Sequence, residues 1–419
     1  MPTGPVMQVQ TPPLFLDHPD TRARPAPLRT AAFEPRQNPA NTNHPSVFIE
    51  EIDDKSVASI DLQWRLLEAR ALEPNPYFTP EFLTAAMRHF RTASAPRLLA
   101  VWQSATPPYP PRLIGIVPLG RPAAGLGRGV LHSWHHPFTA LGAPVLDRDH
   151  AEDALAAALA HLRAKFGDSA AIVFDSVPED GLLADVLRRR AAQDGLGLSV
   201  LARRRRAVLT SAAGSFSGSR RNAKELARLR RRLAGLGRLE CRIVTGYAEI
   251  RSATEEFLAL EAAGWKGRGG TAIVQDPDSA NFTRAMVWAA SRRGKVRIAR
   301  LDLDGRMIAA VILLLDQSTA VLWKTTYDEA LAHYAPGVLL FEEVGARLAA
   351  DPVIRMTDSC AAEGHSMIES LWKERLTVCD LMLGLSPAGR HAMPVRVGQE
   401  KLARGLRAQA GRLYHALVG

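Results

Sequence analysis

The chain has 419 residues, which is too long for one ordinary hydrophobic core and fits two domains. Its 47% hydrophobic and 23% charged residues are typical of a globular protein, and no apolar run approaches the ~20 residues that cross a bilayer. The three cysteines form no CxxC pair, so the sequence indicates neither a disulfide framework nor a metal site. Because the start of the sequence lacks the order of a secretory signal, we expect a cytoplasmic protein.

The first predicted elements follow a leader. Residues 1–45 are rich in Pro, Thr, Asn and Arg without periodicity, which predicts disorder. An ordered pattern then runs from residue 46 to about 210 as strand, two helices, three strands, helix, strand, helix and strand. The strands are predicted at 47–52, 97–102, 112–119, 129–134, 170–177 and 198–209, and the helices at 62–71, up to 90, 151–166 and 182–192.

A cationic segment follows. Between Arg203 and Arg238 the sequence has twelve Lys or Arg and one acid, whereas the remainder has 41 basic and 42 acidic residues. The spacing predicts a helix over 219–236 with Ser219 as its N-cap, a leucine stripe on one face, and on the other face Arg221, Lys224, Arg228 and Arg231. Such a face attracts cofactor phosphates, RNA or an acidic membrane surface, and a merely solvated surface helix is the competing interpretation.

The same element order then occurs a second time. Strands are predicted at 239–244, 295–304, 306–315, 319–327, 353–359 and 376–383, and helices at 248–263, 279–291, 338–349 and 366–372. The Asp304-Gly305 pair is a strong hairpin signal. We therefore expect two α/β domains, 46–210 and 238–388, with a basic linker helix at 211–237 and a basic, helical tail at 389–419.

One candidate site is the turn between strand 319–327 and the helix after it. The residues are Tyr327-Asp328-Glu329 and then Ala335-Pro336-Gly337-Val338-Leu339. Free N–H groups at a helix start favour a bound phosphate, Pro336 suits the first helical position, and Gly337 permits close approach of a ligand. A plain helix cap is the competing interpretation.

A second candidate is the glycine-rich segment Trp265-Lys266-Gly267-Arg268 after helix 248–263. Its indole and two cations could hold an anionic or sugar-like acceptor by stacking and charge. The alternative is a connector whose tryptophan fills the core.

These two segments and the element order resemble the CelD-like and FemAB-type acyltransferases, which carry the BioF-like acetyltransferase domain of the GNAT superfamily. The resemblance covers about residues 46–385. It implies two tandem GNAT-like domains, each a mixed, mostly antiparallel sheet flanked by helices. It also implies acyl-CoA, foremost acetyl-CoA, as co-substrate, with its pyrophosphate at residues 335–339. Surface polysaccharide or cell-envelope precursors are the acceptors that the resemblance indicates.

Further roles follow from this reading. Asp358 ends a strand and could accept the acceptor's proton, although a turn former is equally consistent. Tyr327 or Tyr334 could protonate the departing thiolate. The substrate-binding candidates are Trp265, Lys266, Gly267, Arg268, Lys324, Asp328 and Trp372.

Two other patterns are weaker. Cys360 and His365 lack an orienting third residue, so a small buried cysteine is favoured over a nucleophile. His132, Trp134, His135 and His136 alternate faces in a strand, which favours a cleft lining or core over a metal site.

The sequence therefore predicts acyl transfer from acyl-CoA to an amine or hydroxyl. The alternatives are aminoacyl transfer from tRNA to a peptidoglycan precursor, or a non-catalytic polysaccharide-assembly factor that binds through the basic helix and the tail.

Overall fold

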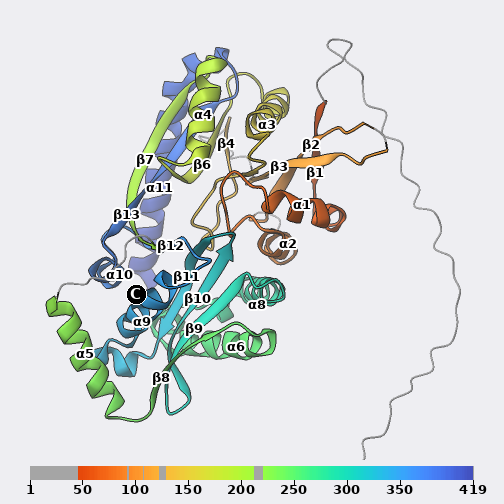
Figure 1. The fold of residues 1–419 in the computed structure, drawn as a ribbon. Helices are drawn as coiled ribbons and strands as arrows, with labels where there is room; N and C mark the ends of the chain where they lie inside the picture. Colours follow the sequence, from red (N-terminus) through yellow and green to blue (C-terminus); the bar gives the residue numbers. More distant parts are fainter. Residues whose placement is uncertain (1–45, 92–93, 107, 122–128, 212–219, 419) are drawn as a thin grey trace, which may run out of the picture. The chain divides into compact units, whose positions relative to one another are not determined.

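The computed structural model describes residues 46–91, 94–106, 108–121, 129–211 and 220–418 (Figure 1). The predicted leader of residues 1–45 and the predicted N-cap Ser219 lie outside the described residues. We call residues 46–210 the N-half and residues 239–384 the C-half.

The N-half has the predicted element order. A threonine cap and a proline at the first position start α2, because the Thr79 side chain accepts a hydrogen bond from the Phe82 N–H. Its elements are β1 (Val47–Ile52), η1 (Val57–Ile60), α1 (Asp61–Glu68), α2 (Pro80–His89), β2 (Arg97–Gln103), β3 (Arg112–Leu119), β4 (Val130–His132), β5 (Val145–Leu146), α3 (Ala151–Phe166), β6 (Ala171–Pro178), α4 (Leu182–Gln193) and β7 (Leu198–Thr210).

The basic helix is α5 (Arg220–Ala234). Leu226 and Leu233 are buried as the stripe predicts. Leu236 is 51% exposed, because the helix ends before it.

The C-half repeats the order of the N-half. Its hairpin turn at Asp304-Gly305 is confirmed, with φ values of 51° and 79° between two antiparallel strands. Its elements are β8 (Leu239–Val244), α6 (Tyr247–Ala263), α7 (Trp265–Arg268), η4 (Ile273–Gln275), α8 (Pro277–Ser291), β9 (Val296–Leu303), β10 (Arg306–Asp316), β11 (Thr319–Tyr327), η5 (Glu329–Tyr334), α9 (Pro336–Ala349), β12 (Met356–Asp358), α10 (Ser366–Leu371) and β13 (Glu374–Gly384).

The two halves exchange their last strands. The sheets have the orders β1-β2-β3-β5 and β4-β6-β13-β7-β12-β11-β10-β9-β8. In the repeat, β7 and β13 are counterparts, yet β13 pairs with β6 of the N-half and β7 pairs with β12 of the C-half. The two strands also pair with each other, from Glu374 opposite Val208 to Leu383 opposite Leu198. The predicted boundaries at residues 210 and 238 therefore fall inside one compact unit, residues 45–419.

Helices cover both faces of the C-half sheet (Figure 1). On one face, α6 and α8 share a core with α2 of the N-half, and the Phe82 and Phe282 rings meet with centroids 5.1 Å apart. On the other face, α9 packs with α5 and α10. The mixed α/β class that we expected is confirmed, and the packing of α2 against α8 joins the halves a second time.

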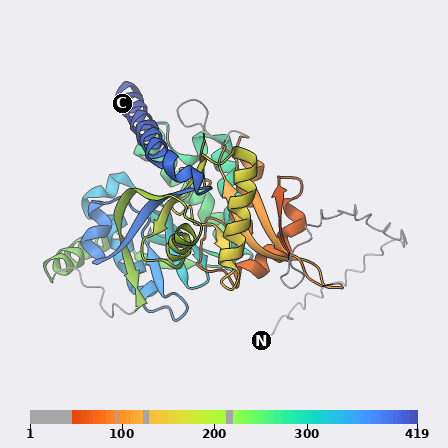
Figure 2. The same cartoon turned by 90° about the horizontal axis from the view of Figure 1, so that it is seen from above.

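The tail forms α11 (Met393–Val418), whose end extends away from the sheet in Figure 2. Its charged side chains reach the N-half strands. Glu400 accepts a hydrogen bond from Arg404 at 2.7 Å and lies 3.2 Å from His132 Nε2. Arg404 also donates to Asp175 at 2.7 Å. None of the described helices is both long and apolar enough to cross a bilayer.

Candidate active site

The site is built where β11 and β12 separate. These parallel strands pair only from Thr319 opposite Met356 to Val321 opposite Asp358. Beyond that point β11 contains a bulge, because Leu322 lies opposite Leu313 but Lys324 lies opposite Ile312, which leaves Trp323 as an extra residue. A bulge redirects side chains and ends regular pairing, so the second part of β11 offers backbone groups that β12 does not use.

The predicted turn opens α9. Ala335 takes a left-handed conformation with φ 51° and ψ 51°, and Pro336 follows at the first helical position. The first backbone bond of the helix is Leu339 N–H to the Ala335 carbonyl at 3.1 Å. Within the described part of the chain, the N–H groups of Gly337 and Val338 have no acceptor. Open N–H groups at a helix start are donors of the kind that can bind an anion.

The side chains of the predicted donor segment face inward. Leu339 is fully buried in the C-half core, and Pro336 and Gly337 are buried too, so the segment offers mainly backbone. A Cβ on Gly337 would lie 3.5 Å from Met367 Cε and 3.7 Å from the Tyr327 ring. A Cβ at Gly337 would thus make ordinary van der Waals contacts with Met367 and Tyr327.

The second predicted segment lies against the first. It is the short helix α7 rather than a loop, and Glu329 of η5 ties it down by accepting from the Trp265 N–H and the Arg268 guanidinium, each at 2.5 Å. The hydrogen bond from Arg268, and next that from Trp265, lowers the pKa of Glu329. The structure therefore brings together two segments that are about 60 residues apart in sequence.

Two residues of α7 fix its position. Lys266 Nζ donates to Glu261 at 2.7 Å and to the Thr325 carbonyl of β11 at 3.1 Å. A Cβ on Gly267 would lie 1.7 Å from the Ala262 carbonyl oxygen, so only glycine fits there. The Trp265 side chain remains 58% exposed and available to a ligand.

Three other substrate-binding candidates differ in setting. Asp328 caps η5 through the Ala330 N–H at 3.0 Å and pairs with Arg306 at 2.7 Å. Trp372 is 1% exposed within the C-half core, which places its ring away from the surface. Lys324 lies beside the bulge with its amine over the Phe138 ring.

The predicted proton carriers, two tyrosines and Asp358, lie in different surroundings. Tyr327 lies against Gly337. Tyr334 ends η5, and the Cζ atom of Arg232 lies 5.3 Å from the centre of the Tyr334 ring. Asp358 is 2% exposed and forms an ion pair of 2.6 Å with Arg206 of β7. Burial raises the pKa of the Asp358 carboxyl against the pull of Arg206. Both tyrosines thus flank the turn, whereas Asp358 is engaged at the strand exchange.

Cys360 has no nucleophilic setting. Tyr77 of the N-half donates a hydrogen bond to its Sγ at 3.2 Å, while His365 is exposed at the start of α10. Burial, and next the Asp358 carboxylate, raises the pKa of the Cys360 thiol to about 12. The thiol therefore stays protonated at neutral pH.

The histidine-rich stretch reaches from the N-half to the site. Trp134 is buried, His135 is exposed, and His136 stacks on Phe90 with ring centroids 4.0 Å apart. The Phe138 carbonyl accepts a hydrogen bond from the Trp323 indole at 2.9 Å. Phe138 and Tyr77 are therefore site residues that sequence reasoning missed, since only the fold brings them to β11 and β12. In the described ranges no three His, Cys, Asp or Glu side chains are placed to hold a metal ion.

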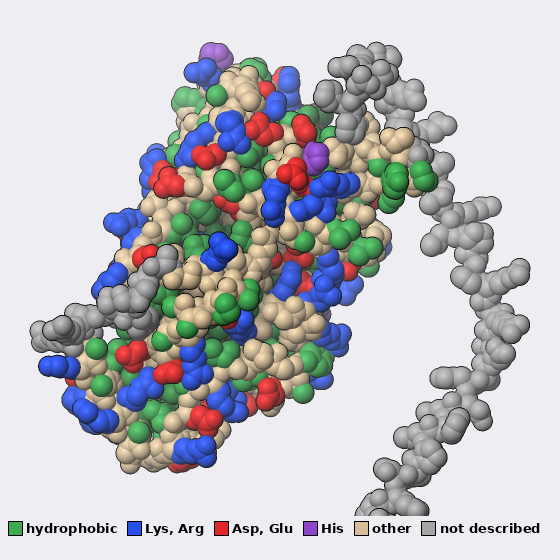
Figure 3. Space-filling model, viewed as in Figure 1, with side chains coloured by type: hydrophobic (Ala, Val, Ile, Leu, Met, Phe, Trp, Pro, Cys, Tyr) green, Lys and Arg blue, Asp and Glu red, His purple; other side chains and the backbone are tan. Residues whose placement is uncertain are grey.

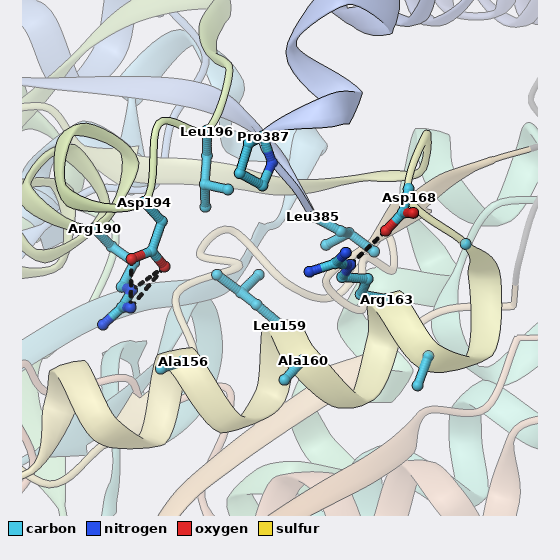
Figure 4. A pocket seen from close by; sticks show the side chains of 12 residues that line it. Ala156, Leu159, Ala160, Arg163, Asp168, Arg190, Asp194, Leu196, Leu385 and Pro387 are labelled. Carbon is cyan, nitrogen blue, oxygen red and sulfur yellow. Dashed lines mark hydrogen bonds and ion pairs between the residues drawn. The ribbon is translucent and has the colours of Figure 1, made fainter.

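A groove of about 780 Å³ lies elsewhere, between α3, α4 and the end of β13 (Figure 4). Its charged groups neutralise each other, as Arg163 pairs with Asp168, and Arg190 with Asp194 at 2.6 Å. Its remaining lining is mostly alanine and leucine. We place the chemistry at β11 instead, because functional sites need convergent polar groups that are not already satisfied.

The cationic segment divides in the fold. On β7, Arg203 pairs with Glu179, Arg204 with Asp380 and Arg206 with Asp358. On α5, Lys224, Arg231 and Arg232 are exposed, and Lys and Arg side chains gather over this helix at the lower left of Figure 3. α5 therefore presents exposed positive charge beside Tyr334 and the start of α9, and Arg205 of β7 is exposed as well.

Comparisons with known proteins match the stretch from α5 to the loop after β12. The sequence model of a family described as "Acetyltransferase (GNAT) domain" matches residues 218–364. No curated protein matches the chain significantly.

Several solved structures are similar to the chain. The C-terminal DUF2156 domain of a protein described as a lysylphosphatidylglycerol synthetase from Agrobacterium fabrum is 14% identical, with 81% of this chain and 96% of that chain covered and a TM-score of 0.47. FemX is 10% identical, with 83% and 100% covered and a TM-score of 0.48. A tandem GNAT protein from the clavulanic acid biosynthesis pathway is 16% identical, with 82% and 99% covered and a TM-score of 0.38. At identities and TM-scores this low, these structures say nothing of the activity of this chain.

The matched residues 218–364 run from α5 to the loop after β12 and contain the bulge, α7, η5 and the open turn of α9. Residues 218–364 of the chain therefore match a GNAT acetyltransferase domain, which indicates acyl transfer as its chemistry.

Proposed function

We propose that the C-half moves an acyl group from acyl-CoA, foremost acetyl-CoA, to an amine or hydroxyl of a cell-envelope or polysaccharide-related precursor. The observation that carries the proposal is the pair of open N–H groups of Gly337 and Val338 where β11 and β12 separate. In this proposal they bind the pyrophosphate of coenzyme A, and the α9 dipole adds to the attraction.

The reaction would proceed in the gap in strand pairing beside the bulge. The acceptor nitrogen or oxygen attacks the thioester carbonyl, a tetrahedral oxyanion forms, and the carbon–sulfur bond then breaks. Backbone N–H groups of β11 left unpaired by β12 stabilise the oxyanion, and Tyr327 or Tyr334 gives its proton to the thiolate. The acceptor loses its own proton to solvent. Holding both substrates in line supplies much of the rate, because a thioester is already activated.

The acceptor would enter over α7. Trp265 offers an exposed ring and Arg268 an exposed guanidinium, and both residues are fixed by Glu329 next to the donor turn. The short tie between the two segments supports a single site that holds donor and acceptor together.

The test is isothermal titration with acetyl-CoA, longer acyl-CoAs and free coenzyme A, on the full chain and on Gly337→Val. The valine side chain would close the approach to two charge-assisted hydrogen bonds of about 1.5 kcal/mol each, so we expect coenzyme A affinity to fall about 100-fold. Glu152→Val is the matched control, at the second position of α3 in the N-half, and should bind as the parent chain does. Undiminished binding by a folded Gly337→Val protein would rule out the turn.

A polyanionic donor is the second candidate, and α5 is the observation that favours it. Its exposed cations lie beside the same turn, and Arg230 reaches the Leu339 carbonyl at 3.5 Å. Saturable binding of aminoacyl-tRNA without binding of any acyl-CoA would establish that donor class. Binding of neither would move the chain to the non-catalytic assembly role.

A further inference from the structure

Lys324 carries a charge that its surroundings do not balance. The bulge at Trp323 places its ammonium over aromatic rings, with Nζ 4.1 Å from the centre of Phe138 and 5.9 Å from that of Trp323. Among the residues that the structure describes, none forms a hydrogen bond or ion pair with this amine. Ring faces attract a cation only weakly and cannot replace a counter-ion.

The acid whose charge acts on Lys324 is Glu261, and both of its carboxylate oxygens already accept hydrogen bonds from other groups. Glu261 is 2% exposed, and its two carboxylate oxygens accept from Lys266 at 2.7 Å and from the Ile273 N–H at 2.9 Å. Lys266 itself repels Lys324. Burial, and next Lys266, lowers the pKa of Lys324 to about 8, which shows how poorly its charge is compensated.

Among the described residues of the N-half, the titratable group that interacts with the Lys324 amine is His136. His136 lies near Lys324, and burial together with the Lys324 ammonium lowers the pKa of its imidazole to about 4. The ring is therefore neutral, and its Nδ1 accepts from the Phe138 N–H at 3.3 Å. Lys324 is thus surrounded by the Lys266–Glu261 ion pair and by neutral rings.

This position lies between the two binding segments. Lys266 of α7 contacts the carbonyl of Thr325, the residue that follows Lys324. β11 ends at Tyr327, three residues after Lys324. We propose that Lys324 is the counter-ion for an anionic group, a carboxylate or a phosphate, of the acceptor, so that the acceptor of this enzyme is acidic. The proposal rests on the acyl transfer proposed above. A half-buried cation without a partner costs free energy, and an acidic acceptor would remove that cost on binding.

The first test uses matched acceptors with acetyl-CoA as donor and release of the coenzyme A thiol as readout. The pairs are glucosamine 6-phosphate against glucosamine, and β-alanine against β-alaninamide. We expect the parent chain to prefer the anionic member of at least one pair by about tenfold in kcat/KM, and Lys324→Met to lose that preference. Lys324→Arg should retain it, because it keeps the charge, whereas a role as proton acceptor would be lost with arginine. Lys55→Met, at an exposed lysine of the N-half, is the control.

The second test needs no turnover. The side-chain amine of Lys324 is followed by NMR in protein with ¹³C-labelled lysine, its signal being the one absent from Lys324→Met. Inorganic phosphate or acetate should raise the pKa of this amine toward the ordinary value of about 10.4, and should leave Lys55 unchanged.

A Lys324 amine whose titration neither anion changes would overturn the proposal, as would a preference for anionic acceptors that survives in Lys324→Met. If no acyl-CoA binds at all, the proposed function fails, and the titration of Lys324 still decides whether this position takes an anion.

Discussion

The turns that precede α3 and α9 occupy equivalent positions in the two halves. They differ in where the negative charge at the turn comes from. Before α9, the N–H groups of Gly337 and Val338 are open. Before α3, the carboxylate of Asp147 is fully buried and accepts from Arg70 at 2.5 Å and from Arg112 at 2.8 Å. Its other oxygen accepts from the Asp149 N–H at 3.0 Å. The N-half turn thus contains its own negative charge, whereas in the proposed function the C-half turn receives one from the donor.

The strands that lead to these turns also differ between the two halves. In the C-half, β11 runs unbroken through one bulge. In the N-half the corresponding stretch is divided into β4 and β5, and residues 133–144 between them carry Trp134 and Phe138 toward the C-half. The C-half has open N–H groups at the start of α9, and the N-half supplies Phe138, whose ring lies beside Lys324 of β11. A duplicated fold can therefore concentrate its chemistry in one copy while both copies remain needed.

The largest expected effect comes from the ion pair at the exchanged strand. Asp358→Ala would leave Arg206, 5% exposed, without its partner, and we expect a loss of about 3–5 kcal/mol in the free energy of unfolding. Urea unfolding measures it. The double variant Arg206→Met with Asp358→Ala should recover part of the loss. A folded Asp358→Asn protein of unchanged stability but greatly reduced kcat would instead return Asp358 to a catalytic role.

The second prediction concerns α11, which docks on the N-half. Burial would lower the pKa of His132, but hydrogen bonds to Asp175 and Glu400 raise it to about 9. A raised histidine pKa means that its contribution, roughly 3 kcal/mol, is complete below pH about 6.5 and is lost as the pH rises through 9.

Glu400 sets the acid limit of the same network. Burial would raise its pKa, yet hydrogen bonds from His132 and Arg404 lower it to about 2, so its contribution is present above pH about 4.5 and is lost as the pH falls toward 2. Hydrogen exchange of α11 between pH 6 and 10 measures the alkaline loss. His132→Gln should flatten the profile, and acyl-CoA binding by the C-half should not follow it. A profile that is unchanged in His132→Gln would contradict the assignment.

The smallest effect sharpens the comparison of the two turns. Asp147→Ala should cost about 2 kcal/mol in stability, less than a fully buried pair because Arg70 and Arg112 are partly exposed. Coenzyme A affinity should stay the same, with one site per chain before and after the change. A second coenzyme A site in the parent chain would break the comparison, since the N-half turn would then also bind a donor.

The sequence predicts more of the order of elements than of their partners. Periodicity and turn residues identify the hairpin at Asp304-Gly305, the basic helix and the helical tail, because these depend on neighbours along the chain. The strand exchange does not follow from such signals. An alternating strand such as β7 reads the same whether its neighbour is β6 or β13, and pairing is decided by contacts more than 150 residues apart.

The residues of the candidate site likewise fall into those that local sequence predicts and those that depend on the fold. The segments around Trp265 and Gly337 are recognisable locally and do meet through Glu329. The contribution of Phe138 depends on a loop that crosses from one half to the other, which no spacing signals. Trp372 and Asp358 show the converse. Each is a residue type that is common in binding sites. The fold places Trp372 in the core and Asp358 in an internal ion pair.

The exchanged strands also set an order of events during synthesis. The edge of β6 is finished at Pro178, but the strand that covers it, β13, is complete only at Gly384, roughly 200 residues later. At about 5–20 residues per second, the ribosome needs roughly 10–40 s to make that stretch. Throughout this interval the nascent N-half presents an unpaired, apolar strand edge of the kind that recruits chaperones or neighbouring nascent chains. The edge of β6 can therefore be covered only after β13 of the C-half has left the ribosome.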